Sequence, residues 1–141
     1  IPTGQIAPVE GTPFDFREPH AIGERIGADN QQLRNGGGYD HNWVIDRKTE
    51  SGIEQVATVW EPASGRTIEV LSDQPGLQVY SGNFFDGKAN GKYGKPLRYR
   101  ESLALETQKY PDSPNHDNFP STVLRPGEEY TQVCIYRFGV K

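Results

Sequence analysis

The sequence of 141 residues contains no methionine and only one cysteine, Cys134. A single cysteine excludes a fold held together by internal disulfides. Cys134 lies in the apolar run VCIY, where we expect a buried thiol, because reactive thiols need an accessible and electropositive setting. The chain starts at Ile1 without an initiator methionine, so we expect a cut piece or a mature segment of a longer translation product.

Long apolar runs and an excess of basic charge are absent as well. No apolar stretch approaches the length of a membrane span, which argues against a membrane partner. The formal net charge is −4, whereas proteins that bind nucleic acid usually present a basic face. We therefore expect neither a membrane nor a nucleic acid as a partner. Hydrophobic residues make up only 33 % of the chain, which indicates a thin core.

Glycine and proline are abundant, with 16 and 11 residues, and this is typical of a β-rich chain with many turns. Helical periodicity is weak everywhere, and only residues 21–34 could hold a short helical turn. The runs at 53–61 and 66–73, joined by the turn signal PASG, predict a β-hairpin. Four further strands are expected at residues 43–48, 77–82, 101–108 and 128–138. The sequence predicts an all-β fold, an antiparallel sandwich or part of one, with residues 1–141 as a single segment.

The first candidate for chemistry is Glu106, which follows the apolar Leu103 and Leu105 and precedes a loop rich in proline, asparagine and aspartate. A carboxylate at the end of a strand can serve as a general base when its surroundings tune its pKa. An acid on the exposed face of a strand is also ordinary. The residues alone favour that second interpretation.

The second candidate is the stretch GGGYDHN at residues 36–42, where glycines allow a close approach of the backbone to a ligand or a positive φ. A phosphate-binding loop is excluded, because no Lys-Ser/Thr pair follows and the next predicted element is a strand. Asp40 and His41 could bind polar groups. They could equally cap a turn.

The third candidate is the stretch QPGLQVYSGNFFDG at residues 74–87. Gln78 and Tyr80 alternate with Leu77 and Val79, so one face of the predicted strand is polar and partly aromatic. Sites for sugars combine amides and carboxylates for the hydroxyls with an apolar wall for the C–H faces. An ordinary half-exposed strand has the same pattern.

Metal binding is the weakest of the interpretations. Asp112, His116 and Asp117 lie close together in the sequence, but metal ligation needs convergent geometry and usually more ligands. The neighbouring asparagines favour a turn instead. The spacing of His20, His41 and His116 matches no zinc motif. We expect no metal and no other cofactor.

Four phrases together resemble the aldose 1-epimerase, or galactose mutarotase, family. They are GTPFDFR at 11–17, GYDHNWVID at 38–46, QPGLQVYSGNFFDG at 74–87 and LETQKYPDSPNHDNFPSTVLRPGEEY at 105–130. The resemblance covers nearly the whole chain and corresponds to the C-terminal portion of a family member. It implies a large twisted β-sandwich, called a supersandwich. It also implies a cofactor-free interconversion of the α and β anomers of an aldose.

The resemblance also implies roles for particular residues. Glu106, in LETQ, matches the general base, while Asp40 and Gln78 match contacts to the sugar hydroxyls. The family's acid histidine, a second histidine and an arginine lie in earlier phrases that this sequence does not contain. The expected partners are therefore a monosaccharide and the N-terminal portion of the same protein.

Two alternatives to the enzyme segment remain. One is a non-catalytic carbohydrate-binding or structural β-module. The other is a relative that acts on sugar phosphates, which would need arginines clustered around a cleft. The sequence offers only the close pair Arg98 and Arg100, with Glu101 directly after it, so this alternative ranks last.

Overall fold

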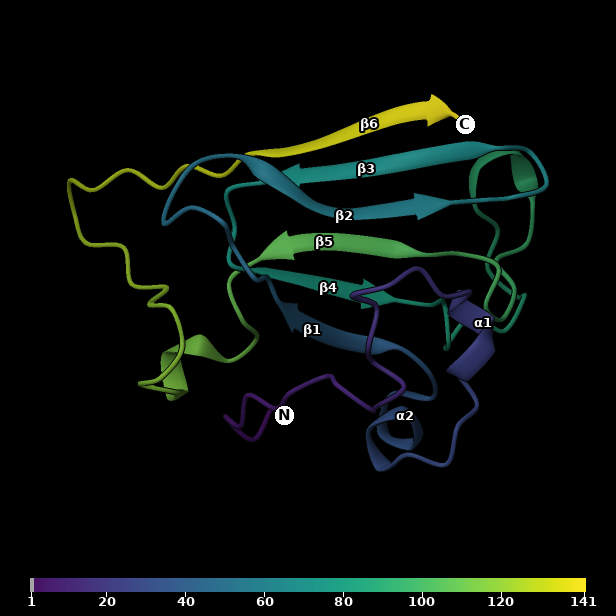
Figure 1. Ribbon diagram of the computed structural model, residues 1–141, viewed down its shortest axis with the longest axis horizontal. Coiled ribbons are helices and arrows are strands. Elements are labelled where there is room, and N and C mark those ends of the chain that lie inside the picture. The colour runs from purple at the N-terminus through teal and green to yellow at the C-terminus, as the bar shows by residue number, and fades with distance from the viewer. Residues whose placement is uncertain (1) are drawn as a thin grey trace. The chain divides into compact units, whose positions relative to one another are not determined.

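The structure is a computed structural model and describes residues 2–141. Strands dominate it, and the helices are short (Figure 1). The strands are β1 (Asp40–Val44), β2 (Glu54–Trp60), β3 (Arg66–Ser72), β4 (Gly76–Tyr80), β5 (Ala104–Gln108) and β6 (Cys134–Val140). The helices are α1 (Ile22–Arg25), α2 (Gln31–Gly36) and the 3₁₀ turns η1 (Lys92–Gly94) and η2 (Ser113–Asn115). The predicted all-β, antiparallel class is confirmed.

The strands form two three-stranded sheets, with the orders β1-β4-β5 and β2-β3-β6. The chain divides into two compact units. One unit consists of Asn42–Leu77 and Leu105–Lys141 with the segment that ends at Gly4. The other consists of Gln5–His41 and Gln78–Ala104. That residues 1–141 act as one segment of a single sandwich domain stays a prediction.

The predicted hairpin is confirmed, because β2 pairs antiparallel with β3. The turn between them is fixed by Glu61, whose carboxylate accepts hydrogen bonds from the backbone N–H groups of Ala63 and Ser64, both at 2.8 Å. Gly65 closes the turn with a φ of +71°, a conformation that glycine adopts without steric cost. The short polar turn therefore sets the register of both strands.

β6 extends this sheet by pairing antiparallel with β3, from Ser72 opposite Cys134 to Arg66 opposite Val140. Residues directly opposite one another share a face of the sheet. One face therefore carries a row of apolar side chains, with Val70 at its fully buried centre. The members of this face are Ala57, Val59, Ile68, Val70, Tyr136, Phe138 and Val140.

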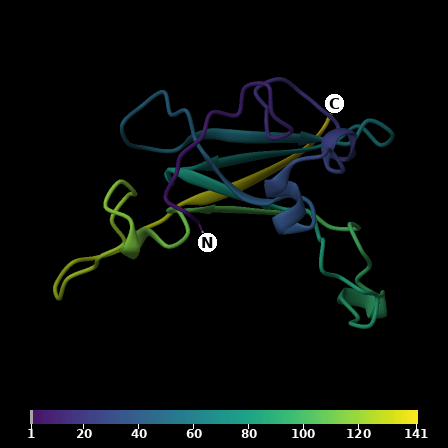
Figure 2. The ribbon, with the colours of Figure 1, turned by 90° about the horizontal axis from the view of Figure 1, so that it is seen from below.

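The predicted strand at residues 128–138 is wrong in its first half, since β6 begins only at Cys134. The backbone N–H of Val133 donates to the carboxylate of Asp73 at 3.1 Å and not to a strand partner. Before it, the side chains of Tyr130 and Gln132 make their own hydrogen bonds. Figure 2 shows the segment from the end of β5 to β6, drawn from green to yellow, as an irregular excursion that leaves and rejoins the strands.

The strand expected at residues 43–48 is also displaced, because β1 spans Asp40–Val44. Beyond its end the N–H of Ile45 donates to the carbonyl of Pro75 at 3.0 Å, and the N–H of Arg47 turns back to the carbonyl of Ile45 at 2.9 Å. This local turn ends the strand. The strand includes Asp40, which the sequence pattern places in the preceding loop.

The C-terminal cap of α2 lies directly before β1 in the sequence. The N-cap of α2 is Asn30, whose side chain accepts a hydrogen bond from the N–H of Gln32 at 2.8 Å. Its C-cap is Gly37, with a φ of +65°, and the N–H of Gly38 donates to the carbonyl of Leu33 at 2.9 Å. The glycines thus serve as a helix C-cap, which explains the cluster without any ligand.

Tyr39, the residue after that cap, is buried to 1 % exposure and anchors the start of β1. Its hydroxyl donates to the carbonyl of Pro13 at 2.9 Å. Its ring packs edge-to-face against Phe14 and Phe16, with centroids 5.7 and 5.4 Å apart. The early GTPFDFR phrase therefore holds the residue next to Asp40.

Candidate functional site

Asp40 and Gln78 lie in direct contact in the structure. The side-chain amide nitrogen Nε2 of Gln78 donates a hydrogen bond to Oδ1 of Asp40 at 2.9 Å. Both side chains are half-buried, at the start of β1 and in the middle of β4. Two sequence-predicted site residues that are 38 positions apart are thus brought together.

A buried polar cluster keeps these strand segments in register. The N–H of Ser81 donates to the carbonyl of Tyr39 at 3.0 Å, and the N–H of Tyr39 donates to Oγ of Ser81 at 3.1 Å. Asn83 adds a hydrogen bond from Nδ2 to the same carbonyl at 2.8 Å. Sequence reasoning does not single out Ser81 or Asn83, and their small polar side chains beside Gly82 are the only available signal.

The second polar atom of Gln78 is unsatisfied. Its amide oxygen Oε1 is buried and has no hydrogen-bond partner among residues 2–141. A buried acceptor without a donor costs free energy, which a ligand hydroxyl could recover by donating to it. The pair therefore combines a carboxylate and an open amide acceptor, two groups that suit a polyhydroxylated ligand.

His41 lies beside this pair but is held as a neutral side chain. Its Nδ1 accepts a hydrogen bond from the backbone N–H of Asp40 at 3.1 Å, so any proton on the neutral ring is carried by Nε2. Burial lowers the pKa of His41, and the charge of Asp40 offsets only part of this effect. The ring packs on Phe14 at a centroid distance of 4.7 Å. A histidine with a lowered pKa is a poor reservoir for a proton near neutral pH.

The other two histidines have local partners of their own. His20 contacts Glu24 at 3.2 Å on an exposed stretch at α1. His116 contacts Asp112 at 3.3 Å, and its ring lies 4.8 Å from that of Phe119. Among the described residues no group of three or more histidine, cysteine, aspartate or glutamate side chains gathers as a metal site would require. Of the three residues considered as metal ligands, Asp112, His116 and Asp117, the structure shows a contact between Asp112 and His116.

Glu106 is exposed in the middle of β5. Thr107 beside it is buried to 7 % exposure. Since successive side chains of a strand point to opposite faces, Glu106 projects from the face opposite to Leu105 and Thr107. Glu106 therefore does not lie on the more buried face of β5, and its exposed carboxylate is accessible to a ligand.

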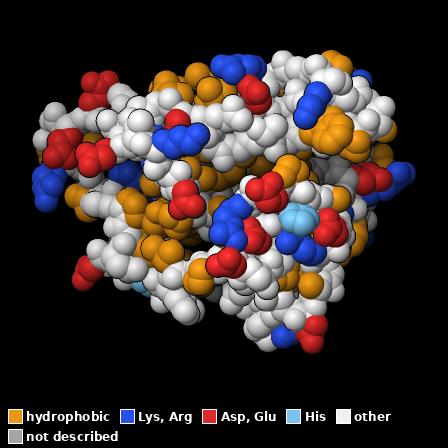
Figure 3. All heavy atoms as spheres, in the orientation of Figure 1, with side chains coloured by type: hydrophobic (Ala, Val, Ile, Leu, Met, Phe, Trp, Pro, Cys, Tyr) orange, Lys and Arg blue, Asp and Glu red, His pale blue; other side chains and the backbone are white. Residues whose placement is uncertain are grey.

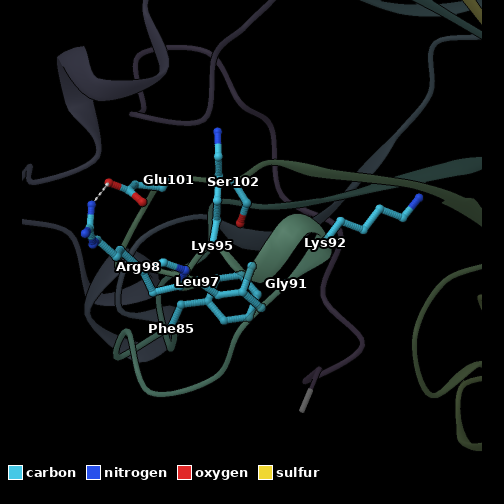
Figure 4. Close-up of a pocket in the computed structure, with 9 residues that line it drawn as sticks. Phe85, Gly91, Lys92, Lys95, Leu97, Arg98, Glu101 and Ser102 are labelled. Atoms are coloured by element: carbon cyan, nitrogen blue, oxygen red, sulfur yellow. Dashed lines mark ion pairs between the residues drawn. The ribbon is translucent and has the colours of Figure 1, made fainter.

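The loop between β4 and β5 contains an open pocket of about 380 Å³. Phe85, Pro96 and Leu97 give it an apolar lining, and Figure 4 shows Lys92 and Lys95 extending from it in different directions. None of the three predicted site residues lines it. Its cationic groups do not converge on one point, as a phosphate site would require.

The two arginines of this loop are engaged by other groups. Arg98 contacts the carboxylate of Glu101 at 3.7 Å, the ion pair drawn in Figure 4. Nη2 of Arg100 donates to the carbonyl of Gly37 at 2.8 Å, and its guanidinium lies over the ring of Tyr99 at 4.7 Å. The arginine pair therefore gives no support to the sugar-phosphate alternative.

The surface in Figure 3 carries charged side chains of both signs, with apolar side chains exposed between them. No helix within residues 2–141 has the length and apolar character needed to cross a membrane.

Comparisons with known proteins agree on one family. The family model for aldose 1-epimerase matches residues 1–137. Galactose mutarotase from Mus musculus is 45 % identical over 140 residues, which is 99 % of this chain and 39 % of that protein. Aldose 1-epimerase from Escherichia coli is 39 % identical, over 98 % of this chain and 40 % of that protein.

A solved structure agrees with the sequence matches. A crystal structure of an aldose epimerase homologue from C. elegans superposes with a TM-score of 0.84 at 32 % identity. The match covers 99 % of this chain and 40 % of that one. The chain therefore spans about two fifths of the length of the relatives it matches.

Proposed function

Because the chain belongs to the aldose 1-epimerase family, we propose that it supplies part of an active site that interconverts the α and β anomers of an aldose such as galactose or glucose. The observation that carries this proposal is the family match over residues 1–137, which includes every phrase with a candidate residue. Those residues lie on β1, β4 and β5.

Glu106 is the general base of the proposed reaction. Its carboxylate takes the proton from the C1 hydroxyl while the bond between C1 and the ring oxygen breaks. The electron pair of that bond goes to the ring oxygen, which receives a proton from an acid. After rotation about the C1–C2 bond, the hydroxyl formed from the ring oxygen adds to the other face of the aldehyde and returns its proton to the acid. The aldehyde oxygen takes back the proton from Glu106, which gives the other anomer. The exposed position of Glu106 supports this role, since a base must reach its proton directly.

The acid of the reaction comes from outside this chain. Burial lowers the pKa of His41, which makes this side chain a poor proton donor near neutral pH. None of His20, His41 and His116 lies in a phrase that matches the family's acid histidine, so we assign the acid to the portion of the family that residues 1–141 do not match. The chain by itself is then inactive.

Asp40 and Gln78 hold the sugar. The Asp40 carboxylate accepts hydrogen bonds from sugar hydroxyls, and the unsatisfied Oε1 of Gln78 accepts one more. Their mutual hydrogen bond fixes both acceptors before a sugar arrives, which reduces the entropy that binding would otherwise lose.

The proposed protein partner is the remaining portion of a family-length polypeptide. On β6 the apolar face continues past the buried Val70 to Phe138 and Val140, which are 74 % and 79 % exposed. β6 is also the last strand of its sheet, so its outer edge is free to pair. We propose that the partner binds at β6, against its outer edge and its exposed apolar side chains.

The test is the Glu106→Gln substitution in the protein at its full encoded length, followed by polarimetry of α-D-galactose. Loss of a general base should lower kcat by roughly 10²- to 10⁴-fold while the fold is kept. Glu101→Gln, an exposed glutamate just before β5, is the matched control and should keep normal turnover. Near-normal turnover of Glu106→Gln would contradict the role of Glu106. Sugar binding without any turnover in the unaltered protein would favour a non-catalytic carbohydrate-binding module.

A further inference from the structure

We propose that Tyr136 and Gln132 are positioning residues for Glu106, because they hold the backbone of β5 on both sides of it. This inference rests on the proposed role of Glu106 as the base. It adds two residues from the C-terminal segment, which act through the backbone of β5.

Two side-chain hydrogen bonds carry the inference. The hydroxyl of Tyr136 donates to the backbone carbonyl of Leu105, the residue before Glu106. Nε2 of Gln132 donates to the backbone carbonyl of Thr107, the residue after it, at 2.6 Å. The same nitrogen lies 3.2 Å from Oγ1 of Thr107. The carbonyls of the two residues that flank Glu106 are thus held by donors from the C-terminal segment.

The geometry of a strand explains why these two contacts act together. Carbonyls of alternate residues point to the same edge of a strand, so those of Leu105 and Thr107 share an edge. β5 is an outer strand in the order β1-β4-β5. An outer edge normally leaves such carbonyls to water. Here side chains hold them, and the strand cannot shift or twist at Glu106 without breaking one of the two bonds.

The two donors are themselves anchored. Oε1 of Gln132 accepts a hydrogen bond from the hydroxyl of Tyr130 at 2.9 Å, which orients the amide so that Nε2 faces Thr107. Tyr136 lies within β6, opposite the fully buried Val70 of β3. The amide of Gln132 is therefore oriented before it bonds Thr107, which reduces the conformational entropy that this bond costs.

The protonation state of Tyr136 suits a permanent donor. Burial raises the pKa of its phenol above 10.0, and Cys134 and the charge of Glu106 act in the same direction. The phenol therefore keeps its proton across the neutral pH range and remains a donor.

A purely structural role would protect the edge of β5 and affect stability alone. Positioning makes a different prediction, because a displaced base lowers the rate of the chemical step without changing how the sugar is held. The two roles are separated by kcat and KM measured on folded protein, and by the same substitutions made in a chain that lacks the base.

The experiment uses the protein at its full encoded length, with Tyr136→Phe and Gln132→Met as separate variants. Each removes one donor and keeps the side-chain volume nearly unchanged. We expect kcat to fall roughly 10- to 100-fold in each, with KM within about twofold of the original. Tyr93→Phe removes a hydroxyl from a side chain that is 94 % exposed, and this control should change neither constant. In the Glu106→Gln background neither substitution should lower the residual rate further.

The outcomes separate this inference from the proposed function. If Glu106→Gln is inactive but Tyr136→Phe and Gln132→Met keep normal kcat, the positioning inference alone is overturned. An equal loss of rate with and without Glu106 would also overturn it, because that is the mark of a general structural defect. If Glu106→Gln itself keeps normal turnover, the proposed function is overturned and the positioning inference with it. Carbonyl ¹³C shifts of Leu105 and Thr107 that stay unchanged in the variants would show that the two bonds do not exist in solution, which overturns the inference as well.

Discussion

The amide of Gln78 donates to the carboxylate of Asp40 across 2.9 Å, joining β4 to β1 by a side-chain contact. The bond leaves the amide oxygen of Gln78 buried and without a partner in the described part of the chain. An oriented amide with an open acceptor is an unfavourable feature in a free protein and a useful one for a ligand that brings a hydroxyl.

Gln78→Leu should weaken sugar binding in the protein at its full encoded length. The substitution removes the open acceptor and also the donor that orients Asp40, so we expect KM to rise roughly tenfold or more. Initial rates from polarimetry over a range of galactose concentrations give KM directly. Gln55→Leu, at an exposed amide that bonds Thr58 on β2, is the matched control. An unchanged KM in Gln78→Leu would remove this side chain from the sugar site.

Val70→Ala should destabilise the 141-residue chain, and Val140→Ala should not. Both valines belong to the same face of one sheet, but Val70 is fully buried whereas Val140 is 79 % exposed. Removing two buried methyl groups costs about 2 kcal/mol of unfolding free energy, through lost burial and a residual cavity. The exposed site should cost less than about 0.5 kcal/mol. Urea unfolding followed by circular dichroism measures both, and equal losses would contradict the burial pattern of this face.

Stability should fall as the pH drops below 6.5, in part because of His41. Burial lowers the pKa of this side chain in the folded chain below its ordinary value of 6.5. Above pH 6.5 the imidazole of His41 is neutral in both the folded and the unfolded chain, so its contribution to the free energy of unfolding is fully present. As the pH falls toward the lowered pKa, the unfolded chain takes up the proton first, so folding loses stability. The free energy of unfolding, measured at a series of pH values, should depend less steeply on pH in His41→Gln than in the original chain. His20→Gln, at an exposed histidine, should keep the original dependence. Equal slopes in all three chains would contradict the burial of a neutral His41.

The all-β class, the β2-β3 hairpin and a helical turn within residues 21–34 were predictable because they rest on local signals. The turn PASG and the alternation of apolar residues specify the hairpin within one short stretch. Of the two interpretations of the glycine cluster, ligand approach or positive φ, the structure shows the second, because Gly37 is the C-cap of α2. A glycine cluster in the sequence indicates that a residue adopts a positive φ, but it does not indicate which helix, strand or turn requires this conformation.

Two features could not be predicted, because distant residues decide them. β6 starts late since Asp73, about sixty positions away, takes the N–H of Val133 that a strand would use. The Asp40–Gln78 bond likewise joins residues whose separation in the sequence gives no hint of contact.

The site residues were identified in different ways. Asp40, Gln78 and Glu106 were candidates from the sequence pattern, and the family resemblance supplied their roles. The hydrogen bonds of Gln132 and Tyr136 to β5 had no signal in the sequence, because a tyrosine or glutamine near a strand looks the same there whichever group it bonds.

We have proposed that this chain supplies the base and the sugar contacts of a mutarotase active site and lacks the acid. Polarimetry of α-D-galactose tests it most directly, on the 141-residue chain alone and after mixing with a separately produced portion that corresponds to the unmatched part of the relatives. We predict no acceleration by the chain alone and faster mutarotation in the mixture, with Glu106→Gln abolishing the gain. Mutarotation accelerated by the chain alone would contradict the account, because one of its own three histidines would then have to serve as the acid.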